Sequence, residues 1–290
     1  MNQLKLWWRL ARGEHAVMSF VAIVASAIIS TSSFSTNYLF FALGPALIVL
    51  ASFIFNDVMD LPSDLALGRM ERPLVSKKIS EKTAFGLSLS LFAAGLALCL
   101  AASLLAFQIA FFYSLISVAY SLYLKKLPLL GNAIVSTTYA ISFVYGNAVA
   151  VNSFDVGSWN LLVISFAGFA FLAGLGRELL ITLRDVKGDK KIGALTLPMV
   201  VGGKATVMLS AFLLLLAIAA TFTPLRVFRS GNFLVYLLFV GVCDALLLYS
   251  AISAWRDYSP ENLVRIRNYT IRAFQLALAG FVAIAVITVF

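Results

Sequence analysis

The sequence predicts an all-α, polytopic membrane bundle, and three observations support this fold class. Hydrophobic residues make up 61% of the 290-residue chain and charged residues only 12%. Soluble domains are about 45–50% apolar and about 25% charged, so a soluble core has no room for this surplus. The mean hydropathy of +0.96 agrees with lipid as the solvent. The apolar residues also fall into runs of roughly 20, the length that a helix needs to cross a bilayer.

Nine such runs form the expected transmembrane helices. The third and fourth are separated by a very short link around Ala106, and we treat them as two helices. The runs lie near residues 16–33, 38–56, 83–104, 107–124, 130–150, 159–181, 205–223, 233–252 and 271–290. We expect the whole chain, residues 1–290, to form a single membrane-embedded domain.

The basic residues are distributed unevenly between the connecting segments. Every Lys and Arg except Arg226 and Arg229 lies in the N-terminal segment or in alternate loops. These loops cover residues 57–82, 125–126, 177–204 and 256–272. Because basic loops remain on the cytoplasmic side, we expect the N-terminus and the two long loops to be cytoplasmic in a multi-pass protein of the cell membrane. Contact with anionic lipid then explains the net charge of +9, and we expect no nucleic-acid partner.

The few cysteines and histidines exclude several kinds of site. Cys99 and Cys243 both lie inside apolar runs, and His15 is the single histidine of the chain. No spaced Cys/His set is present, so the sequence does not support a zinc site or a disulfide framework. One histidine also makes a His-based catalytic triad or metal site a poor explanation of function.

Spaced carboxylates open both long loops. The first loop, residues 57–82, begins with Asn56, Asp57, Asp60 and Asp64, and the second loop, residues 182–204, contains Asp185 and Asp189. Acids four residues apart project from one face of a helix, where like charges repel. Desolvation at the membrane raises that cost, and a divalent cation would remove the conflict. The similar positions of the two clusters suggest an internal duplication.

The side chains in these clusters favour magnesium. All the candidate ligands are oxygen donors, which suit a hard cation better than zinc. Magnesium keeps several waters and is commonly held by a few carboxylates together with substrate phosphates. Two acidic clusters facing each other could therefore hold a diphosphate, with nearby Arg and Lys neutralising the remaining charge. The alternative is that both clusters are solvated loop carboxylates, which is the commoner explanation of a single motif of this kind.

At these residues the sequence resembles the UbiA superfamily of intramembrane prenyltransferases. Asn56, Asp60 and Asp64 fill the first family motif, N-x-x-x-D-x-x-x-D, and Asp185 and Asp189 fill the second, D-x-x-x-D. Other stretches similar to the family are Arg72-Pro73-Leu74, Tyr120-Ser121 with Lys125, and Gly131-Asn132 with Tyr145-Gly146. The resemblance covers essentially the whole chain.

The resemblance implies nine transmembrane helices around a central chamber, with a cytoplasmic loop cap. An isoprenyl diphosphate would place its head at the acidic motifs, and Mg2+ would assist departure of diphosphate before an acceptor captures the allylic cation. The implied metal ligands are Asn56, Asp60, Asp64, Asp185 and Asp189. The implied diphosphate-binding residues are Arg72, Lys125, Arg184 and Lys187. Catalytic roles are implied for Asp60, Asp185 and Tyr120, and acceptor binding for Arg12 and Asn132.

Within the superfamily, three stretches look most like the archaeal digeranylgeranylglyceryl phosphate synthases. They are Arg177-Glu178, residues 185–189 and residues 193–198, although Thr182 replaces an acid that this pattern often carries. This likeness implies transfer of a geranylgeranyl group from geranylgeranyl diphosphate to the hydroxyl of geranylgeranylglyceryl phosphate. The alternatives are an aromatic, quinone-precursor acceptor, a protein that binds isoprenoids without turnover, and a non-enzymatic transporter.

Four residues keep two interpretations each. The ring of Tyr120 could stabilise a cation or anchor its helix at the membrane interface. Asn132 could hydrogen-bond within the chamber or cap the start of its helix. Asp244 could be functional or could pair with a hydroxyl of a neighbouring helix. Asp64 could be a direct metal ligand or, because Pro62 resists a helix interior, could come from a new turn and lie outside the ligand set.

Overall fold

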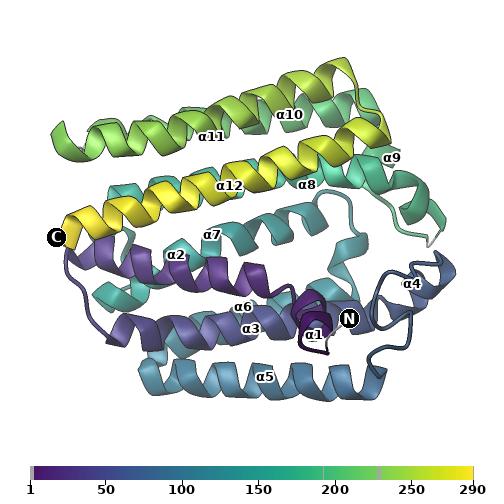
Figure 1. Cartoon of the computed structure of the whole chain (residues 1–290), viewed down its shortest axis with the longest axis horizontal. Helices are drawn as coiled ribbons and strands as arrows, with labels where there is room; N and C mark the ends of the chain where they lie inside the picture. Colours follow the sequence, from purple (N-terminus) through teal and green to yellow (C-terminus); the bar gives the residue numbers. More distant parts are fainter. Residues whose placement is uncertain (1–2, 192, 227–229, 290) are drawn as a thin grey trace. The chain divides into compact units, whose positions relative to one another are not determined.

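The computed structural model describes residues 3–191, 193–226 and 230–289, and these residues form helices without strands. Nine of the described helices are long and apolar enough to cross a membrane. The predicted all-α, polytopic membrane fold is therefore confirmed (Figure 1). The helices divide between two compact units, which we describe separately. The expectation of a single functional domain stays a prediction.

The N-terminal unit comprises Met1–Val24 and Ser35–Lys125. It contains α1 (Gln3–Ala11), the first part of α2 (Gly13–Thr31), α3 (Asn37–Met59), α4 (Leu61–Ala66), α5 (Glu81–Ala102) and α6 (Leu104–Leu122). The short helix α1 packs its apolar face on α3, where Leu6 and Leu10 join a buried cluster with Ile54 and Val58. That packing places α1 beside the end of α3 that carries the first acidic motif.

Close approach of α3 and α5 depends on two glycines. A Cβ atom at Gly44 would come within 2.6 Å of Cys99 Sγ and 2.8 Å of the Gly95 carbonyl oxygen. A Cβ atom at Gly95 would come within 2.7 Å of Ile48 and 2.8 Å of the Gly44 carbonyl oxygen. Small residues allow helix backbones to approach in this way within membranes, where packing rather than the hydrophobic effect holds helices together.

Pro62 explains the break between α3 and α4. Proline has no N–H to donate to the carbonyl four residues earlier, so the helical hydrogen bonds are interrupted after the Asp60 amide donates to the Asn56 carbonyl oxygen at 2.9 Å. Asp60 ends α3, and α4 begins at Leu61 with Pro62 in its first turn. The interpretation of Asp64 as part of a new turn is confirmed, because Asp64 lies on α4.

The C-terminal unit comprises Ala25–Phe34 and Lys126–Phe290. Its helices are α7 (Leu130–Val151), α8 (Leu161–Lys191), α9 (Leu197–Val201), α10 (Gly203–Thr221), α11 (Ser230–Arg256) and α12 (Pro260–Val289). The last turns of α2 also belong to it, because the Ser26 hydroxyl donates to the Phe143 carbonyl at 2.7 Å and Ser30 bonds Asn147 at 2.6 Å. Short 3₁₀ turns cover Leu124–Lys126, Val156–Ser158 and Thr223–Arg226.

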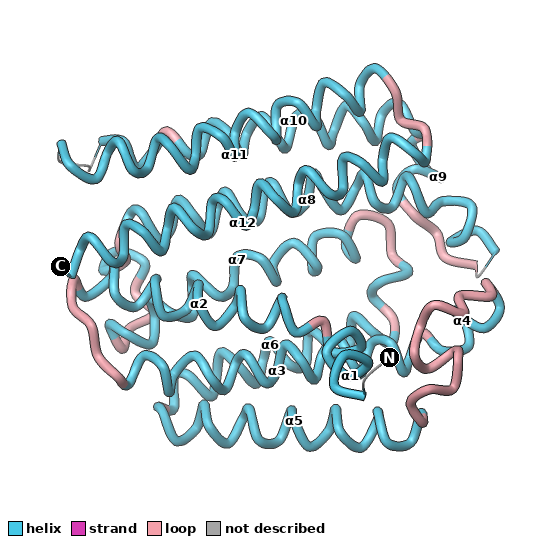
Figure 2. The backbone as a smooth tube through the Cα atoms, viewed as in Figure 1, coloured by secondary structure: helices cyan, strands magenta, loops and turns pink. Residues whose placement is uncertain are grey.

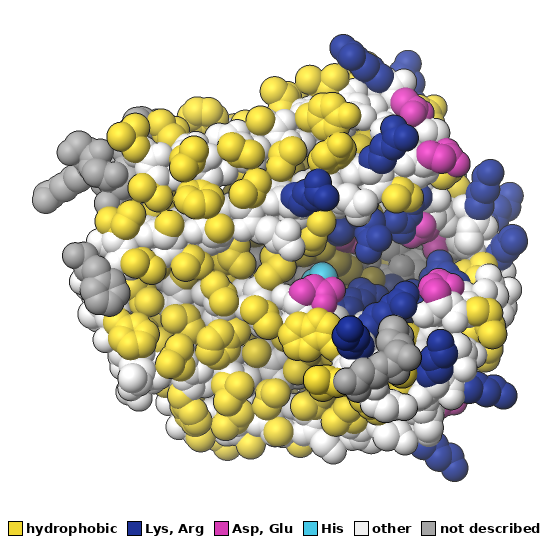
Figure 3. All heavy atoms as spheres, in the orientation of Figure 1, with side chains coloured by type: hydrophobic (Ala, Val, Ile, Leu, Met, Phe, Trp, Pro, Cys, Tyr) yellow, Lys and Arg dark blue, Asp and Glu magenta, His cyan; other side chains and the backbone are white. Residues whose placement is uncertain are grey.

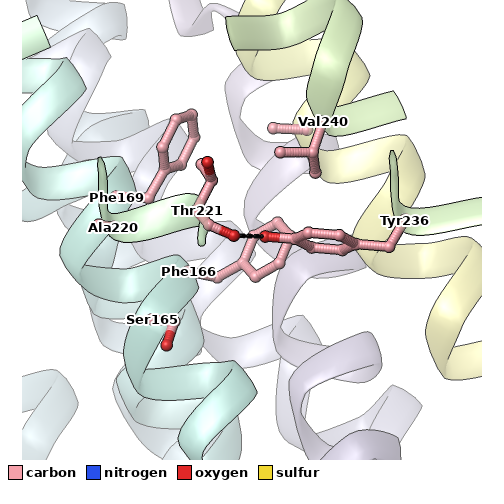
Figure 4. Close-up of a pocket in the computed structure, with 8 residues that line it drawn as sticks. Ser165, Phe166, Phe169, Ala220, Thr221, Tyr236 and Val240 are labelled. Carbon is pink, nitrogen blue, oxygen red and sulfur yellow. Dashed lines mark hydrogen bonds between the residues drawn. The ribbon is translucent and has the colours of Figure 1, made fainter. Parts of the chain in front are cut away.

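Aromatic side chains fill the core of the C-terminal unit. The ring of Phe166 on α8 lies 4.5 Å from that of Phe281 on α12 and 6.2 Å from that of Tyr236 on α11. Figure 4 shows Phe166 and Phe169 beside a small pocket, with the Tyr236 hydroxyl donating to the Thr221 carbonyl oxygen at 2.5 Å. This bond ties the end of α10 to α11.

Three helix boundaries differ from the sequence prediction. Helix α8 continues to Lys191, so the predicted loop 182–204 is wrong for its first half. Helix α12 begins at Pro260 rather than near residue 271, because polar residues continue the helix beyond the apolar run. The third and fourth runs are joined at Ser103, whose hydroxyl caps α6 by accepting from the Ala106 amide at 3.0 Å. Arg229 and Phe290 lie outside the described residues.

Connections without helical structure are short except between α4 and α5, where the pink tube in Figure 2 follows residues 67–80. Figure 3 shows hydrophobic side chains covering the visible lengths of α5, α11 and α12. Within each unit, Lys, Arg, Asp and Glu side chains gather toward the helix ends that carry the acidic motifs. This distribution leaves an apolar belt suited to lipid along the helices.

Candidate active site

The exposed part of the first acidic motif consists of Asn56, Asp60 and Lys125. Lys125 Nζ lies 2.5 Å from Asp60 Oδ1, and the Asn56 amide nitrogen donates to Asp60 Oδ2 at 3.0 Å. The Asn56 carbonyl oxygen is buried and has no hydrogen-bond partner among the described residues. The side chain of Asp60 is 23% exposed. The Asp60 carboxylate therefore lies beside the Lys125 ammonium, and the Asn56 amide oxygen beside it has no hydrogen-bond partner among the described residues.

The buried part of the same motif is an ion-pair network of two carboxylates and three arginines. Arg72 Nη1 lies 2.5 Å from Asp64 Oδ2 and 3.3 Å from Asp57 Oδ1. Arg69 Nη1 lies 3.1 Å from Asp64 Oδ1, and Arg12 Nη2 lies 3.6 Å from Asp57 Oδ1. The arginines offset part of the desolvation cost of the two acids.

Burial dominates the acidity of Asp64. Desolvation raises the pKa of the Asp64 carboxyl above its ordinary value, and the positive charges of Arg72 and Arg69 lower it in part. Nearby Asp60 and Asp57 act in the same direction as burial. The two arginines therefore offset part of the desolvation of the charged Asp64 carboxylate.

Arg12 reaches the first motif because the chain turns sharply between α1 and α2. Its backbone has a φ of 48°, in the left-handed region. The guanidinium carbon of Arg12 lies 4.6 Å from the centre of the Phe53 ring, which is a cation–π arrangement. The side chain is 39% exposed and so retains access to a second anion.

The predicted residue Tyr120 lies in the last turn of α6 and is partly exposed. Lys125 follows it in the 3₁₀ turn Leu124–Lys126. The Y-S-x-x-x-K stretch thus spans the end of α6, and the structure brings its lysine to Asp60. Neither interpretation of the Tyr120 ring is decided by this position.

The second acidic motif lies on α8, where Asp185 and Asp189 are one turn apart. Arg184 forms a bidentate salt bridge with Asp185, in which Nε lies 2.7 Å from Oδ1 and Nη2 lies 2.6 Å from Oδ2. The Asp185 side chain remains 33% exposed. Lys187 is exposed, and Asp189 is partly exposed. The helix holds both carboxylates on one face, as their spacing predicts.

A buried polar cluster continues from this motif into the apolar part of α8. Arg177 Nη1 lies 2.6 Å from Glu178 Oε1 and 3.1 Å from the Tyr139 hydroxyl, which itself donates to Glu178 at 3.2 Å. Glu178, Thr182 and Asp185 follow one another along the same face of the helix. The sequence motifs do not assign Tyr139, Arg177 or Glu178 to the site, although charged residues inside an apolar run are a signal of function.

Asn132 ties α7 to this face of α8. Its amide nitrogen donates to Thr182 Oγ1 at 2.7 Å and to the Glu178 carbonyl oxygen at 3.3 Å. The alternative in which Asn132 caps the start of its helix is wrong, because Leu129 is the N-cap residue and makes no side-chain cap. The interaction with α8 leaves only the Asn132 carbonyl oxygen for an acceptor.

Asp244 pairs with a hydroxyl of a neighbouring helix, one of its two interpretations. Thr221 Oγ1 on α10 donates to Asp244 Oδ2 on α11 at 2.8 Å. The other carboxylate oxygen, Oδ1, is buried without a hydrogen-bond partner among the described residues. The two acidic motifs do not include this residue.

The available oxygen donors fit magnesium better than a metal that needs a full set of protein ligands. No group of three or more His, Cys, Asp or Glu side chains within the described ranges is arranged to hold a metal by itself. Magnesium can bind at a site with few protein ligands, because it retains several waters and is also coordinated by phosphate oxygens of a substrate. Two partial ligand sets are suitable. One is the unpartnered oxygen of Asn56 with the partly exposed carboxylate of Asp60, and the other is the partly exposed carboxylate of Asp185.

The model of the UbiA prenyltransferase family matches residues 17–286 of this chain. The chain belongs to the UbiA prenyltransferase family. This UbiA-family protein is 32% identical over 281 residues to a digeranylgeranylglyceryl phosphate synthase from Methanoculleus marisnigri. The alignment covers 96% of this chain and 97% of that relative.

Solved structures show the same fold. A structure of a digeranylgeranylglyceryl phosphate synthase superimposes with a TM-score of 0.74 at 24% identity and covers 99% of both chains. A UbiA homologue from Archaeoglobus fulgidus bound to GPP and Mg2+ superimposes with a TM-score of 0.66 at 17% identity. That alignment covers 95% of this UbiA-family protein and 99% of the homologue. The helical arrangement is therefore that of the UbiA family.

Proposed function

We propose that this protein transfers a geranylgeranyl group from geranylgeranyl diphosphate to the hydroxyl of geranylgeranylglyceryl phosphate in ether-lipid synthesis, with Mg2+ as cofactor. The observation that carries this proposal is the full-length match to a digeranylgeranylglyceryl phosphate synthase. Two independent features support it. The partly exposed carboxylate of Asp60 lies beside Lys125 and accepts a hydrogen bond from Asn56, and a homologue of the same fold binds GPP and Mg2+.

Four residues would hold the metal in this proposal, and cations around them would bind the diphosphate. The metal ligands are Asn56, Asp60, Asp185 and Asp189. When bound, Mg2+ withdraws negative charge from the departing diphosphate. Arg72, Lys125, Arg184 and Lys187 would contact its remaining oxygens, since cations on a leaving diphosphate stabilise the charge that develops there.

The acceptor and the allylic group would be held by other side chains. Arg12 keeps an exposed guanidinium that suits the phosphate of the acceptor. The Asn132 carbonyl oxygen would accept a hydrogen bond from a substrate hydroxyl. The ring of Tyr120 would face the positive charge on the allylic carbon, because the face of an aromatic ring attracts cations. After the carbon–oxygen bond to diphosphate breaks, the acceptor oxygen would bond to the allylic carbon, and the hydroxyl proton would pass to the released diphosphate or to water.

We also propose that the N-terminus and the helix ends with both acidic motifs face the cytoplasm. The uneven distribution of Lys and Arg supports this orientation.

A transfer assay tests the proposed function. Purified protein in detergent receives radiolabelled geranylgeranyl diphosphate and Mg2+, with geranylgeranylglyceryl phosphate and 4-hydroxybenzoate offered in parallel. We expect a labelled diether that disappears with EDTA and in an Asp185→Ala variant. Label on the aromatic acid alone would overturn the acceptor and keep the reaction class. Absence of transfer to either acceptor would contradict the proposed enzyme activity.

A further inference from the structure

We propose that Asp64 is a positioning residue that holds Arg69 and Arg72 for the diphosphate and is not a magnesium ligand. This inference rests on the proposed function, because it assigns roles within the same site. It separates Asp64 from Asn56 and Asp60, with which it shares the N-x-x-x-D-x-x-x-D motif. The separation follows from what surrounds each oxygen atom.

Both carboxylate oxygens of Asp64 already have a cationic partner. Oδ1 lies 3.1 Å from Arg69 Nη1 and Oδ2 lies 2.5 Å from Arg72 Nη1. The side chain is only 3% exposed, so there is no open approach for a hydrated metal ion. Coordination would require Asp64 to leave one arginine, and uncompensated buried charges are strongly unfavourable.

Asp60 has different surroundings, although it is one turn away. It is 23% exposed, and a single cation, Lys125, contacts its Oδ1. Its Oδ2 accepts from the neutral amide of Asn56. The neighbouring Asn56 carbonyl oxygen has no partner among the described residues. Asp60 therefore has a partly exposed carboxylate and Asn56 an oxygen without a partner, whereas both oxygens of Asp64 are already bound by arginines.

The arginines that Asp64 holds retain unused donors. Arg72 uses only Nη1 in its bonds to Asp57 and Asp64, so its Nε and Nη2 make no hydrogen bond within the described parts of the chain. A guanidinium carries five N–H groups. Arg69 uses only Nη1 and is 34% exposed. Three arginines on two carboxylates also leave one positive charge in excess, which favours an anion.

The local backbone explains why Asp64 can hold these residues. Gly68 follows α4 with a φ of 66°, a conformation that glycine adopts without strain. The chain reverses there, and the Arg69 amide donates to the Asp64 carbonyl oxygen at 3.0 Å. Asp64 therefore binds the start of the loop 67–80 through both its backbone and its side chain. The loop then carries Arg72 back to Asp57.

Binding measurements on the full chain in detergent test this assignment without relying on turnover. Mn2+ binding, followed by electron paramagnetic resonance, reports the metal site, and calorimetry with inorganic pyrophosphate and Mg2+ reports the anion site. Asp60→Asn should weaken Mn2+ binding by about tenfold or more, since it removes a direct ligand. Asp64→Asn should leave Mn2+ affinity within about twofold and weaken pyrophosphate binding by about tenfold, the equivalent of about 1.4 kcal/mol.

Arg69→Gln provides a second test that keeps the Asp64 carboxylate in place. We expect weaker pyrophosphate binding and unchanged Mn2+ binding, and Lys78→Gln, at an exposed lysine of the same loop, controls for the lost charge. Equal loss of Mn2+ in the Asp64 and Asp60 variants would show that Asp64 is a ligand. Unchanged pyrophosphate affinity in Arg69→Gln would also overturn the proposal. Failure of the unaltered protein to bind either probe would instead refute the proposed function.

Discussion

Asp60 and Asp64 are chemically identical side chains one turn apart, and burial gives them different partners. Asp60 bonds an amide and a lysine and remains partly exposed, whereas Asp64 is enclosed by arginines. A motif written as spaced carboxylates does not contain this difference. The roles of single residues therefore depend on which cation each oxygen meets.

Lys125 should matter for the diphosphate more than for the metal. In Lys125→Gln, Asp60 loses its cationic partner and becomes more available to a metal ion, so we expect Mn2+ binding to be retained or tightened. Turnover should fall by about 100-fold, the order found when one donor to a developing negative charge is removed. Steady-state transfer and Mn2+ titration measure both effects. Lys126→Gln, an exposed neighbour in the same turn, is the control and should change neither.

Arg69→Gln should destabilise the protein in a pH-dependent way. Burial raises the pKa of Asp64, and Arg69 lowers it in part. While Asp64 is ionised, the variant lacks one of its two cationic partners. As the pH falls through the raised pKa, the neutral carboxyl no longer needs that partner, so the difference in melting temperature from the parent should shrink. Thermal unfolding in detergent at neutral and at acidic pH measures this, and a constant difference would contradict it.

At the scale of helices, packing depends on positions where a side chain has no room. Gly44 and Gly95 bring α3 and α5 together, and Ser210 on α10 donates to the Gly176 carbonyl oxygen on α8 at 2.7 Å. Asn132 joins α7 to α8 in a similar way. These contacts set where the acidic ends of α3 and α8 are held within their own units.

Gly95→Ala should destabilise the N-terminal unit. The new Cβ would meet Ile48 at 2.7 Å and the Gly44 backbone oxygen at 2.8 Å, and the backbone cannot move away cheaply. We expect a loss of about 1–3 kcal/mol, typical of overpacking. Gly86→Ala on the same helix meets nothing within 4 Å and should be neutral or slightly stabilising. Denaturation in mixed micelles distinguishes the two, and equal stabilities would contradict the packing argument.

Sequence patterns predicted the helices better than their ends. Apolar runs of membrane length identify spans, but α8 and α12 continue through polar residues such as Asp185 and Arg265 because a helix tolerates charges where it leaves the bilayer. The acidic residues of the site were visible as spacing. The sequence did not reveal that Arg72 pairs with both Asp57 and Asp64, because this pairing depends on the reversal of the chain at Gly68.

At the scale of the whole molecule, similarity extends along nearly the full chain. The family model, the relative from Methanoculleus marisnigri and the superimposed structures all cover more than nine-tenths of it. The membrane fold and the family therefore rest on the entire sequence rather than on two short motifs. Orientation in the membrane rests on charge alone and needs a separate test.

Cysteine labelling from either side of the membrane should establish the orientation. The native Cys99 and Cys243 are buried and should react little with a polar maleimide. Single cysteines at exposed Lys78 and Lys190 should be labelled from the cytoplasmic side, and one at exposed Asp155 from the opposite side, because basic segments stay in the cytoplasm. The reverse pattern would contradict the proposed orientation while leaving the fold unchanged.

The junction at Ser103 has a consequence for how the chain enters the membrane during synthesis. One residue separates α5 from α6, and no charged side chain occurs from Thr83 to Leu124. If the two helices insert as a hairpin, no charged loop has to cross the hydrocarbon region. Both helices can therefore enter the lipid together. The first helix then need not be anchored on the far side before the second is made.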